Sequence, residues 1–216
     1  SESDLELALS CLKTVRRLGR LLSLDSQQRR WVVLHYYEMC ASQAGQDHKK
    51  VVGAWREAVS ELCDDVVIQS RFRAAQWEYW VWLLESDLQQ LAEGQDVSAH
   101  FKALMAQEEP YAEDLFAPVQ CADGNKMPFQ LDQFHKKIVE LGQLHETMVK
   151  ADAEVAKDIS SLDIVIRDLK DASRELNQPV LSKKADTLGM KFVESKIREG
   201  DDYKKQGRRA AMARAY

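Results

Sequence analysis

The sequence predicts an all-α protein, an elongated helical bundle whose long helices have coiled-coil character. Three observations lead to this expectation. The 216 residues include only four prolines, which leave residues 1–109 and 129–178 free to form helices. Apolar residues recur at helical spacing through both tracts. No stretch alternates apolar and polar residues as a half-buried strand would.

Three helices are expected before the turn signal at Gly94. Ser3 and Glu6 have the spacing of a capping box, so a first helix should begin there. Asp25 stands where it can cap a second helix through the segment WVVLHYYEMC. Asp47 can cap a third helix, which we expect to run to Gly94 over roughly 45 residues, with a lapse in its apolar spacing around Ser70.

A proline-containing loop is expected to divide the chain into two helical halves. A short helix at 99–107 should follow the turn at Gly94 and complete the first half, residues 1–109. Three of the four prolines then fall within residues 110–128, which we expect to form the loop. Residues 129–216 form the second half, with a long helix, a final helix and a basic tail.

The clearest pattern of the second half is a heptad repeat. Every seventh residue from Phe134 is apolar, which predicts one long helix that ends near Asn177, before Pro179. A final helix is expected from Ser182 until its apolar pattern fades near Gly200. We expect the apolar column to form an interface with another helix, and its members are Phe134, Leu141, Met148, Val155, Leu162, Leu169 and Leu176.

Two polar residues interrupt the companion column of this repeat. His145 and Asp152 occupy positions that are otherwise apolar, two helical turns apart. They can fix the register or the choice of partner at some cost in stability. Alternatively, the seam is open to solvent at this point. In a third interpretation His145 is a pH switch, because its protonation below about pH 6.5 would loosen the seam.

The segment QWEYWVWLLE, residues 76–85, carries three of the five tryptophans. On a helical wheel Trp77 and Trp80 fall on a core-facing stripe. Opposite them lies a second apolar stripe, which either packs inside the bundle or forms a protein interface. Glu78 and Glu85 disfavour a membrane anchor, whereas a cage for a cationic ligand stays open. The interface candidates on this second stripe are Ile68, Phe72, Tyr79, Trp82 and Leu83.

Motifs for catalysis, cofactors or metals are not found in the sequence. The closest approach is His145-Glu146, which begins like a zinc-binding HExxH helix but has Val149 in place of the second histidine. Without that histidine a metal lacks its pair of ligands on one helical face. We therefore expect no enzymatic activity, no cofactor, no bound metal and no small-molecule ligand.

The cysteines and the hydropathy predict an intracellular, cytoplasmic protein. Cys11, Cys40, Cys63 and Cys121 contain no CxxC pair, which favours reduced, packed thiols over disulfides. We expect no membrane-spanning segment, because no window approaches 18 consecutive apolar residues, and no signal peptide.

The charge pattern gives little attraction to nucleic acid. The net charge is -5, so we do not expect nucleic acid to be a partner. The C-terminal tail is basic, and we interpret it first as a solubilising end. It could instead contact anionic lipid through its clustered cations, which include Lys204, Lys205, Arg208 and Arg209.

These patterns favour a non-enzymatic scaffold for protein–protein interaction, or a structural subunit of a larger assembly. Its partner would be another protein or a second copy of the chain, bound through the heptad column or the aromatic stripe. The long helices are also similar to those of BAR-type dimers, which implies a peripheral membrane-binding dimer as an alternative. In having a tryptophan-bearing helix, the chain is also similar to spectrin-type triple-helical repeats. A helical-bundle enzyme with an unrecognised site is a further alternative.

Overall fold

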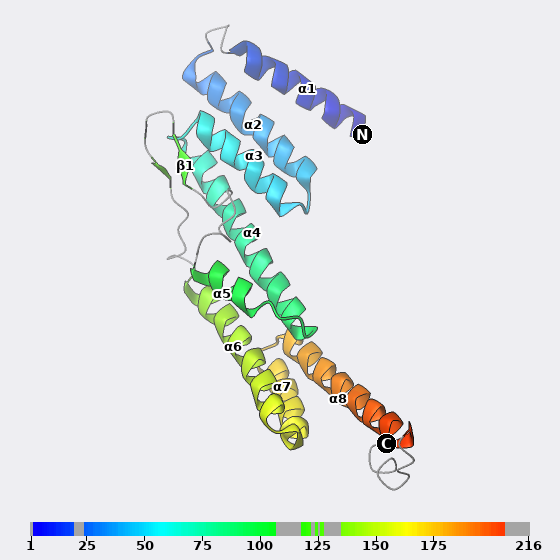
Figure 1. Ribbon diagram of the computed structural model, residues 1–216. Helices are drawn as coiled ribbons and strands as arrows, with labels where there is room; N and C mark the ends of the chain where they lie inside the picture. The colour runs from blue at the N-terminus through cyan, green and yellow to red at the C-terminus, as the bar shows by residue number, and fades with distance from the viewer. Residues whose placement is uncertain are drawn as a thin grey trace. The chain divides into compact units, whose positions relative to one another are not determined.

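The computed structural model shows an all-α protein (Figure 1). The described part of the chain consists of residues 2–19, 24–106, 118–121, 124, 126–127 and 135–205. Eight α-helices, one 3₁₀ turn and a short two-stranded ribbon form within these residues. The chain divides into two compact units: unit 1 comprises residues 1–83 and 107–134, and unit 2 comprises residues 84–106 and 135–216.

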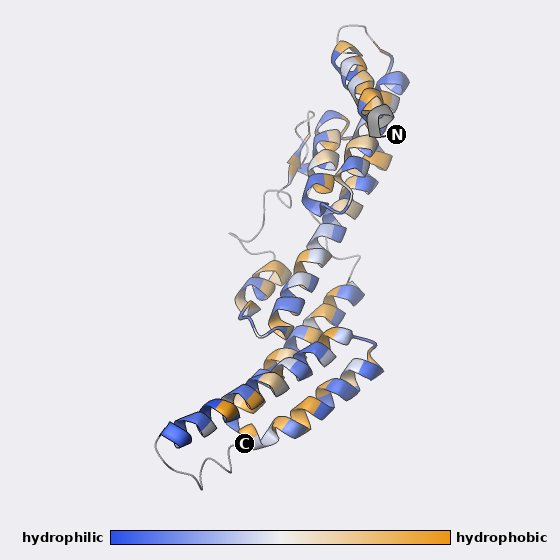
Figure 2. Ribbon diagram, turned by 90° about the vertical axis from the view of Figure 1, so that its right-hand side faces the viewer, coloured by the Kyte–Doolittle hydropathy of each residue, from blue (hydrophilic) through white to orange (hydrophobic). Residues whose placement is uncertain are grey.

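Unit 1 is built from consecutive helices that pack on their neighbours. Helix α1 (Glu2–Gly19) packs on α2 (Ser26–Ala44), and α2 packs on α3 (His48–Glu61) (Figure 1). The first part of α4 (Val66–Ala92) completes this unit, and the end of α4 belongs to unit 2. Figure 2 shows hydrophobic and hydrophilic residues mixed along the helices.

Unit 2 contains the remaining helices. Helix α5 (Ser98–Ala106) packs on α6 (His135–Lys157), which leads through a 3₁₀ turn, η3 (Ile159–Ser161), into α7. Helix α7 (Leu162–Glu175) packs against α6 and more extensively against α8 (Pro179–Lys205). The division between the units falls within α4.

Two of the expected helix starts are confirmed by their caps. The Asp25 carboxylate accepts hydrogen bonds from the backbone N–H groups of Gln27 and Gln28, and the Gln28 side chain accepts from the Asp25 N–H. This reciprocal arrangement is a capping box. Asp47 caps α3 by accepting from the Lys50 N–H. Ser3, expected to cap the first helix, has its side chain outside the described residues.

The expectation of one helix from Asp47 to Gly94 is wrong. Helix α3 ends at Glu61 and α4 begins at Val66, separated by a turn. Asp65 caps α4 by accepting hydrogen bonds from the backbone N–H groups of the second and third following residues. The apolar spacing continues across the turn because both helices bury a face within unit 1. The helical spacing of the apolar residues therefore gave no sign of the turn between α3 and α4.

The expectation of one helix to Asn177 is also wrong. Asp158 ends α6 and caps η3 by accepting from the N–H and the hydroxyl of Ser160. The heptad column is consequently shared between two helices that pack on each other. Of its members Leu141, Met148, Leu162 and Leu169 are buried, Val155 is half-buried, Leu176 is exposed, and Phe134 lies outside the described residues.

The last helix also differs from expectation at both ends. Helix α8 begins at Pro179 and not at Ser182. Proline is tolerated in the first turn of a helix, where its missing N–H has no intrahelical partner. The helix continues through the buried Gly200 to Lys205, although the apolar pattern weakens there.

A disulfide joins the α3–α4 turn to the ribbon of unit 1, so the expectation of four reduced thiols is wrong. Strand β1 (Val119–Gln120) pairs antiparallel with β2 (Lys126–Met127) and lies against α3. Cys121 follows β1 and is bonded to Cys63, with 5.5 Å between their Cα atoms. The two cysteines are 58 residues apart in sequence, and only the tertiary fold brings them together. Cys11 and Cys40 are free.

Candidate functional site

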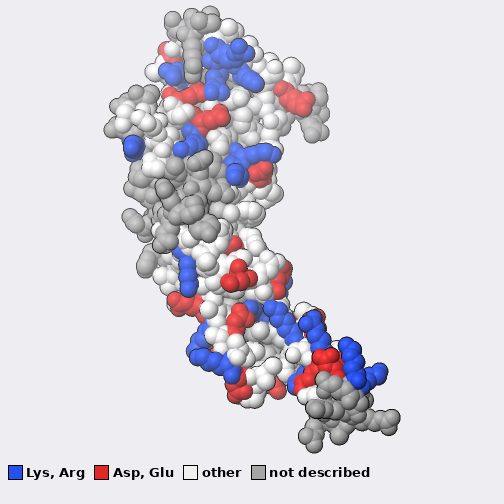
Figure 3. Space-filling view, viewed as in Figure 1, with Lys and Arg blue, Asp and Glu red and all other residues white. Residues whose placement is uncertain are grey.

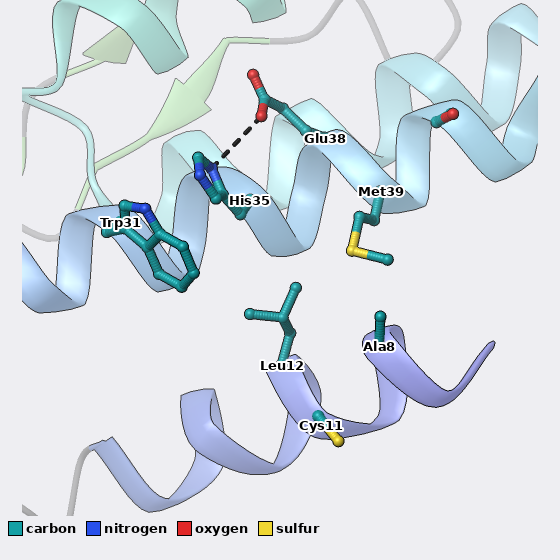
Figure 4. A pocket seen from close by; sticks show the side chains of 8 residues that line it. Ala8, Cys11, Leu12, Trp31, His35, Glu38 and Met39 are labelled. Atoms are coloured by element: carbon teal, nitrogen blue, oxygen red, sulfur yellow. Dashed lines mark ion pairs between the residues drawn. The ribbon is translucent and has the colours of Figure 1, made fainter. Parts of the chain in front are cut away.

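Two hollows lie along the line where α1 and α2 meet. Figure 4 shows the first of them. They have volumes of about 560 and 520 Å³, respectively. Trp31 borders both of them. The first is lined by Ala8, Cys11, Leu12, Trp31, His35, Glu38, Met39 and Ser42, and the second by Val15, Leu24, Asp25, Gln27, Gln28, Trp31 and Val32. We refer to the two hollows together as the α1–α2 groove.

Trp31 is the central side chain of this groove. It is 55% exposed, an unusual degree of exposure for an aromatic side chain of this size. Its ring lies beside that of His35, with 4.4 Å between the centroids. Both residues share one face of α2 with Met39 because they are spaced four apart. Helix α2 therefore presents a continuous strip of large side chains to the groove.

Helix α1 adds a second exposed apolar strip on the same side. Ala8 and Leu12 line the groove. Next to them, four residues spaced four, four and three apart follow one face of the helix. These residues, which we call the α1 stripe, are Leu7, Cys11, Val15 and Leu18, and all four are exposed.

The opposite face of α1 is fixed by a polar network. The Arg16 guanidinium lies 4.9 Å from the ring centroids of both Tyr36 and Tyr37 and is bonded to Glu61 of α3. The Tyr37 hydroxyl lies 2.9 Å from a carboxylate oxygen of Glu61 and 3.2 Å from one of Glu57, and the two acceptors share its single proton. Burial raises the pKa of Tyr37 still further above neutral pH. This network holds α1 on α2 and leaves the α1 stripe facing outward.

The groove lacks the arrangement of a nucleophilic enzyme site. Figure 4 shows the sulfur of Cys11 pointing away from His35. The His35 Nδ1 instead lies 3.5 Å from a carboxylate oxygen of Glu38. The other free thiol, Cys40, is paired with Tyr36, and burial raises its pKa. Catalysis by a thiol needs a base within hydrogen-bonding reach of the sulfur and a lowered pKa. The groove is suited to apolar binding.

Neither a metal centre nor a membrane span was found in the described part of the chain. No group of three or more His, Cys, Asp or Glu side chains is placed to hold a metal ion within these residues. Among the same residues, none of the helices combines the length and the apolar character needed to cross a bilayer.

The predicted aromatic stripe of α4 lies mostly inside unit 1. Ile68, Phe72 and Tyr79 are buried by the chain itself, and Leu83 is half-buried. Only Trp82 reaches the surface, with 48% of its area exposed. Its ring stacks on Tyr79 with 6.0 Å between centroids.

On the core-facing stripe, Trp80 is buried and Trp77 is half-buried, and their rings stack with 5.3 Å between centroids. Two apolar sides of the helix are therefore covered within the chain.

The structure separates the two polar seam residues. His145 is 4% exposed and stacks face to face on Phe101 of α5, with 4.3 Å between the ring centroids. Its Nε2 is buried and has no hydrogen-bond partner. Burial, with a smaller contribution from Lys102, lowers the pKa of His145 and favours the neutral ring.

Asp152 is explained by a residue that the sequence pattern did not single out. Lys184 of α8 is buried, and its Nζ donates to Asp152 Oδ2 at 2.7 Å and to the Leu91 carbonyl at 3.0 Å. Lys184 lies on the same helical face as the buried Leu181 and Leu188. This spacing was the one sign in the sequence that Lys184 is buried, because it places the lysine among the apolar residues of α8.

The basic end of the chain is only partly described. Lys204 and Lys205 are exposed on the last turn of α8, and Lys205 lies 3.7 Å from Asp202. Arg208 and Arg209 lie outside the described residues. On the face drawn in Figure 3, basic and acidic side chains are interspersed.

Comparison with known proteins gives no relative from which a function can be transferred. No family model matches the sequence, and no curated protein or solved structure is significantly similar to it. The function of the chain is therefore inferred from its geometry alone.

Proposed function

We propose that this chain is a non-enzymatic interaction protein, a helical scaffold or structural subunit that binds another helix in the α1–α2 groove. The observation that carries the proposal is the position of Trp31, half exposed between two hollows with largely apolar walls. Tryptophan is strongly enriched among the residues that dominate binding energy at protein interfaces. Tyr37, Trp55 and Trp80 of unit 1 are buried, and Trp82 is exposed to a similar degree as Trp31 but does not line the groove.

The shape of the groove fits a helical ligand. An amphipathic helix inserts side chains at positions i, i+3 or i+4, and i+7, which lie on one face along its axis. The two hollows on either side of the Trp31 ring could each accept one such side chain of the ligand helix. The α1 stripe extends the apolar surface alongside, so that a helix laid in the groove would cover it as well.

A matched pair of variants tests this function. Trp31 and Trp82 are both about half exposed and both belong to unit 1, but only Trp31 lines the groove. We expect the proteins that co-purify with the native chain to be lost with Trp31→Ala and retained with Trp82→Ala. Identical companions with both variants would exclude the groove as the binding surface.

The remaining expectations of shape and location stay predictions. An elongated bundle would suit a scaffold, because it separates binding surfaces along its length. A cytoplasmic location agrees with the two free cysteines, whereas the Cys63–Cys121 disulfide is more typical of oxidising compartments. Counting free thiols in protein isolated under alkylating conditions from its native source would distinguish these environments.

A further inference from the structure

The exposed surface of α1 and α2 carries both a protrusion and a recess. Trp31 projects at 55% exposure, and beside it lies the hollow lined by Ala8, Cys11 and Leu12. This hollow is open to the surface, and its volume of about 560 Å³ leaves room for an indole ring. A two-fold symmetric dimer requires a patch that is complementary to itself, with every protrusion matched by a recess on the same surface.

The α1 stripe has the same property along the helix. When two copies of α1 lie antiparallel about a point near residue 13, Leu7 of one faces Leu18 of the other. Cys11 then faces Val15 of the second copy, because the spacings within the stripe read almost the same in both directions. The four residues are uncharged, so the pairing buries no ionised group of the stripe.

The charges of α1 favour the antiparallel arrangement. Glu6 stands near the N-terminal end of the helix, and Arg17 stands in its last turn. Antiparallel copies bring the acidic end of one helix beside the basic end of the other and align the two helix dipoles favourably. Both side chains stand away from the α1 stripe, so this attraction acts between the ends of the two helices and not across the packed face.

We propose that the occupant of the α1–α2 groove is a second copy of this chain, related by a two-fold axis that crosses α1 near residue 13. Trp31 of each copy inserts into the hollow beside Trp31 of the other, and the two α1 stripes pack antiparallel. This inference rests on the proposed function and specifies its partner.

The association state of the full chain tests the inference directly. Sedimentation velocity over a range of protein concentrations should show a reversible dimer for the native chain and for Trp82→Ala. Trp31→Ala should raise the dimer dissociation constant about 30-fold or more, as loss of a central tryptophan at an interface does. Trp31 is half exposed in the single chain, so the variant is expected to fold.

Disulfide trapping then tests the geometry of the pair. In a Cys11→Ser background, Leu7→Cys combined with Leu18→Cys should form a covalent dimer on mild oxidation. Glu6→Cys combined with Arg17→Cys has the same separation of eleven positions on the opposite face of α1 and should stay monomeric under denaturing, non-reducing conditions.

The outcomes separate this inference from the proposed function. If the native chain is monomeric at every concentration, a second copy is not the occupant of the groove. The co-purification experiment with Trp31→Ala then still shows whether the groove binds another protein. A dimer that is unaffected by Trp31→Ala, or that is trapped equally by both cysteine pairs, also overturns it. Loss of dimer with Trp31→Ala together with trapping only through Leu7→Cys and Leu18→Cys supports it.

Discussion

The Lys184 ammonium of α8 lies 2.7 Å from the Asp152 carboxylate of α6, although the lysine is only 1% exposed. The Leu91 carbonyl at the end of α4 accepts a second hydrogen bond from the same nitrogen. Three helices of unit 2 thus meet at one buried positive charge. The partner carboxylate is half-buried and keeps contact with solvent.

Removal of the carboxylate should destabilise unit 2. We expect Asp152→Ala to lower the free energy of unfolding by about 2 to 3 kcal/mol, because it leaves a buried ammonium with only a neutral acceptor. All five tryptophans belong to unit 1, so unfolding of unit 2 should be followed by far-UV circular dichroism in urea. Glu154→Ala, an exposed acid on the same helix, is the control and should cost less than about 0.5 kcal/mol. Equal effects would show that the pair does not stabilise the unit.

The second prediction concerns pH and His145. Its pKa is lowered in the folded chain, so below about pH 6.5 the unfolded chain binds a proton that the folded chain does not. The contribution to stability is therefore intact above about pH 6.5 and is lost as the pH falls, at up to about 1.4 kcal/mol per pH unit.

His145→Leu supplies the comparison, because the carboxylates and the other histidines titrate in both proteins. We expect the stability difference between the native chain and this variant to change between pH 7.5 and 5.5. A difference that is independent of pH would show that the buried ring does not resist protonation.

The third prediction concerns the disulfide. Reduction of Cys63–Cys121 should lower the free energy of unfolding of unit 1 by about 2 to 4 kcal/mol, because the bond closes a loop of 58 residues in the unfolded chain. Tryptophan fluorescence in urea measures this unit specifically. Thiol titration under denaturing conditions should give two free thiols before reduction and four after it. Four thiols in the untreated protein would contradict the bond.

The fourth prediction compares two tryptophans on α4. Trp80→Ala should cost about 3 to 5 kcal/mol of unfolding free energy, because this side chain is almost completely buried. Trp82→Ala removes a ring that is 48% exposed and should cost much less, about 1 kcal/mol, mainly through the lost stack on Tyr79. Similar losses from both changes would place Trp82 in the core.

Helix content and helix starts could be predicted from the sequence, because they depend on neighbouring residues. Asp25 and Asp47 cap the helices that follow them through hydrogen bonds that span only two or three positions. The breaks at Asp65 and Asp158 have caps of the same kind. Neither break was predicted, because the apolar residues keep their helical spacing through both turns. This spacing was given more weight than the possible N-cap aspartate at each turn.

Contacts between distant parts of the chain could not be predicted. Lys184 meets Asp152 across 32 positions, and Cys63 meets Cys121 across 58. Sequence spacing carries no information about either pair, since both depend on how the helices fold back. The exposure of Trp31 could not be predicted either, because it depends on which face of α2 is covered by neighbouring helices.

The bond between Cys63 and Cys121 also makes the intervening segment a closed covalent ring. Helices α4 and α5 and the turn around Gly94 all lie inside it. A protease that cuts the chain in that turn would open the ring without releasing a fragment. Under denaturing conditions the two pieces of the nicked protein would stay joined by the disulfide, and they would separate only after a thiol reductant is added.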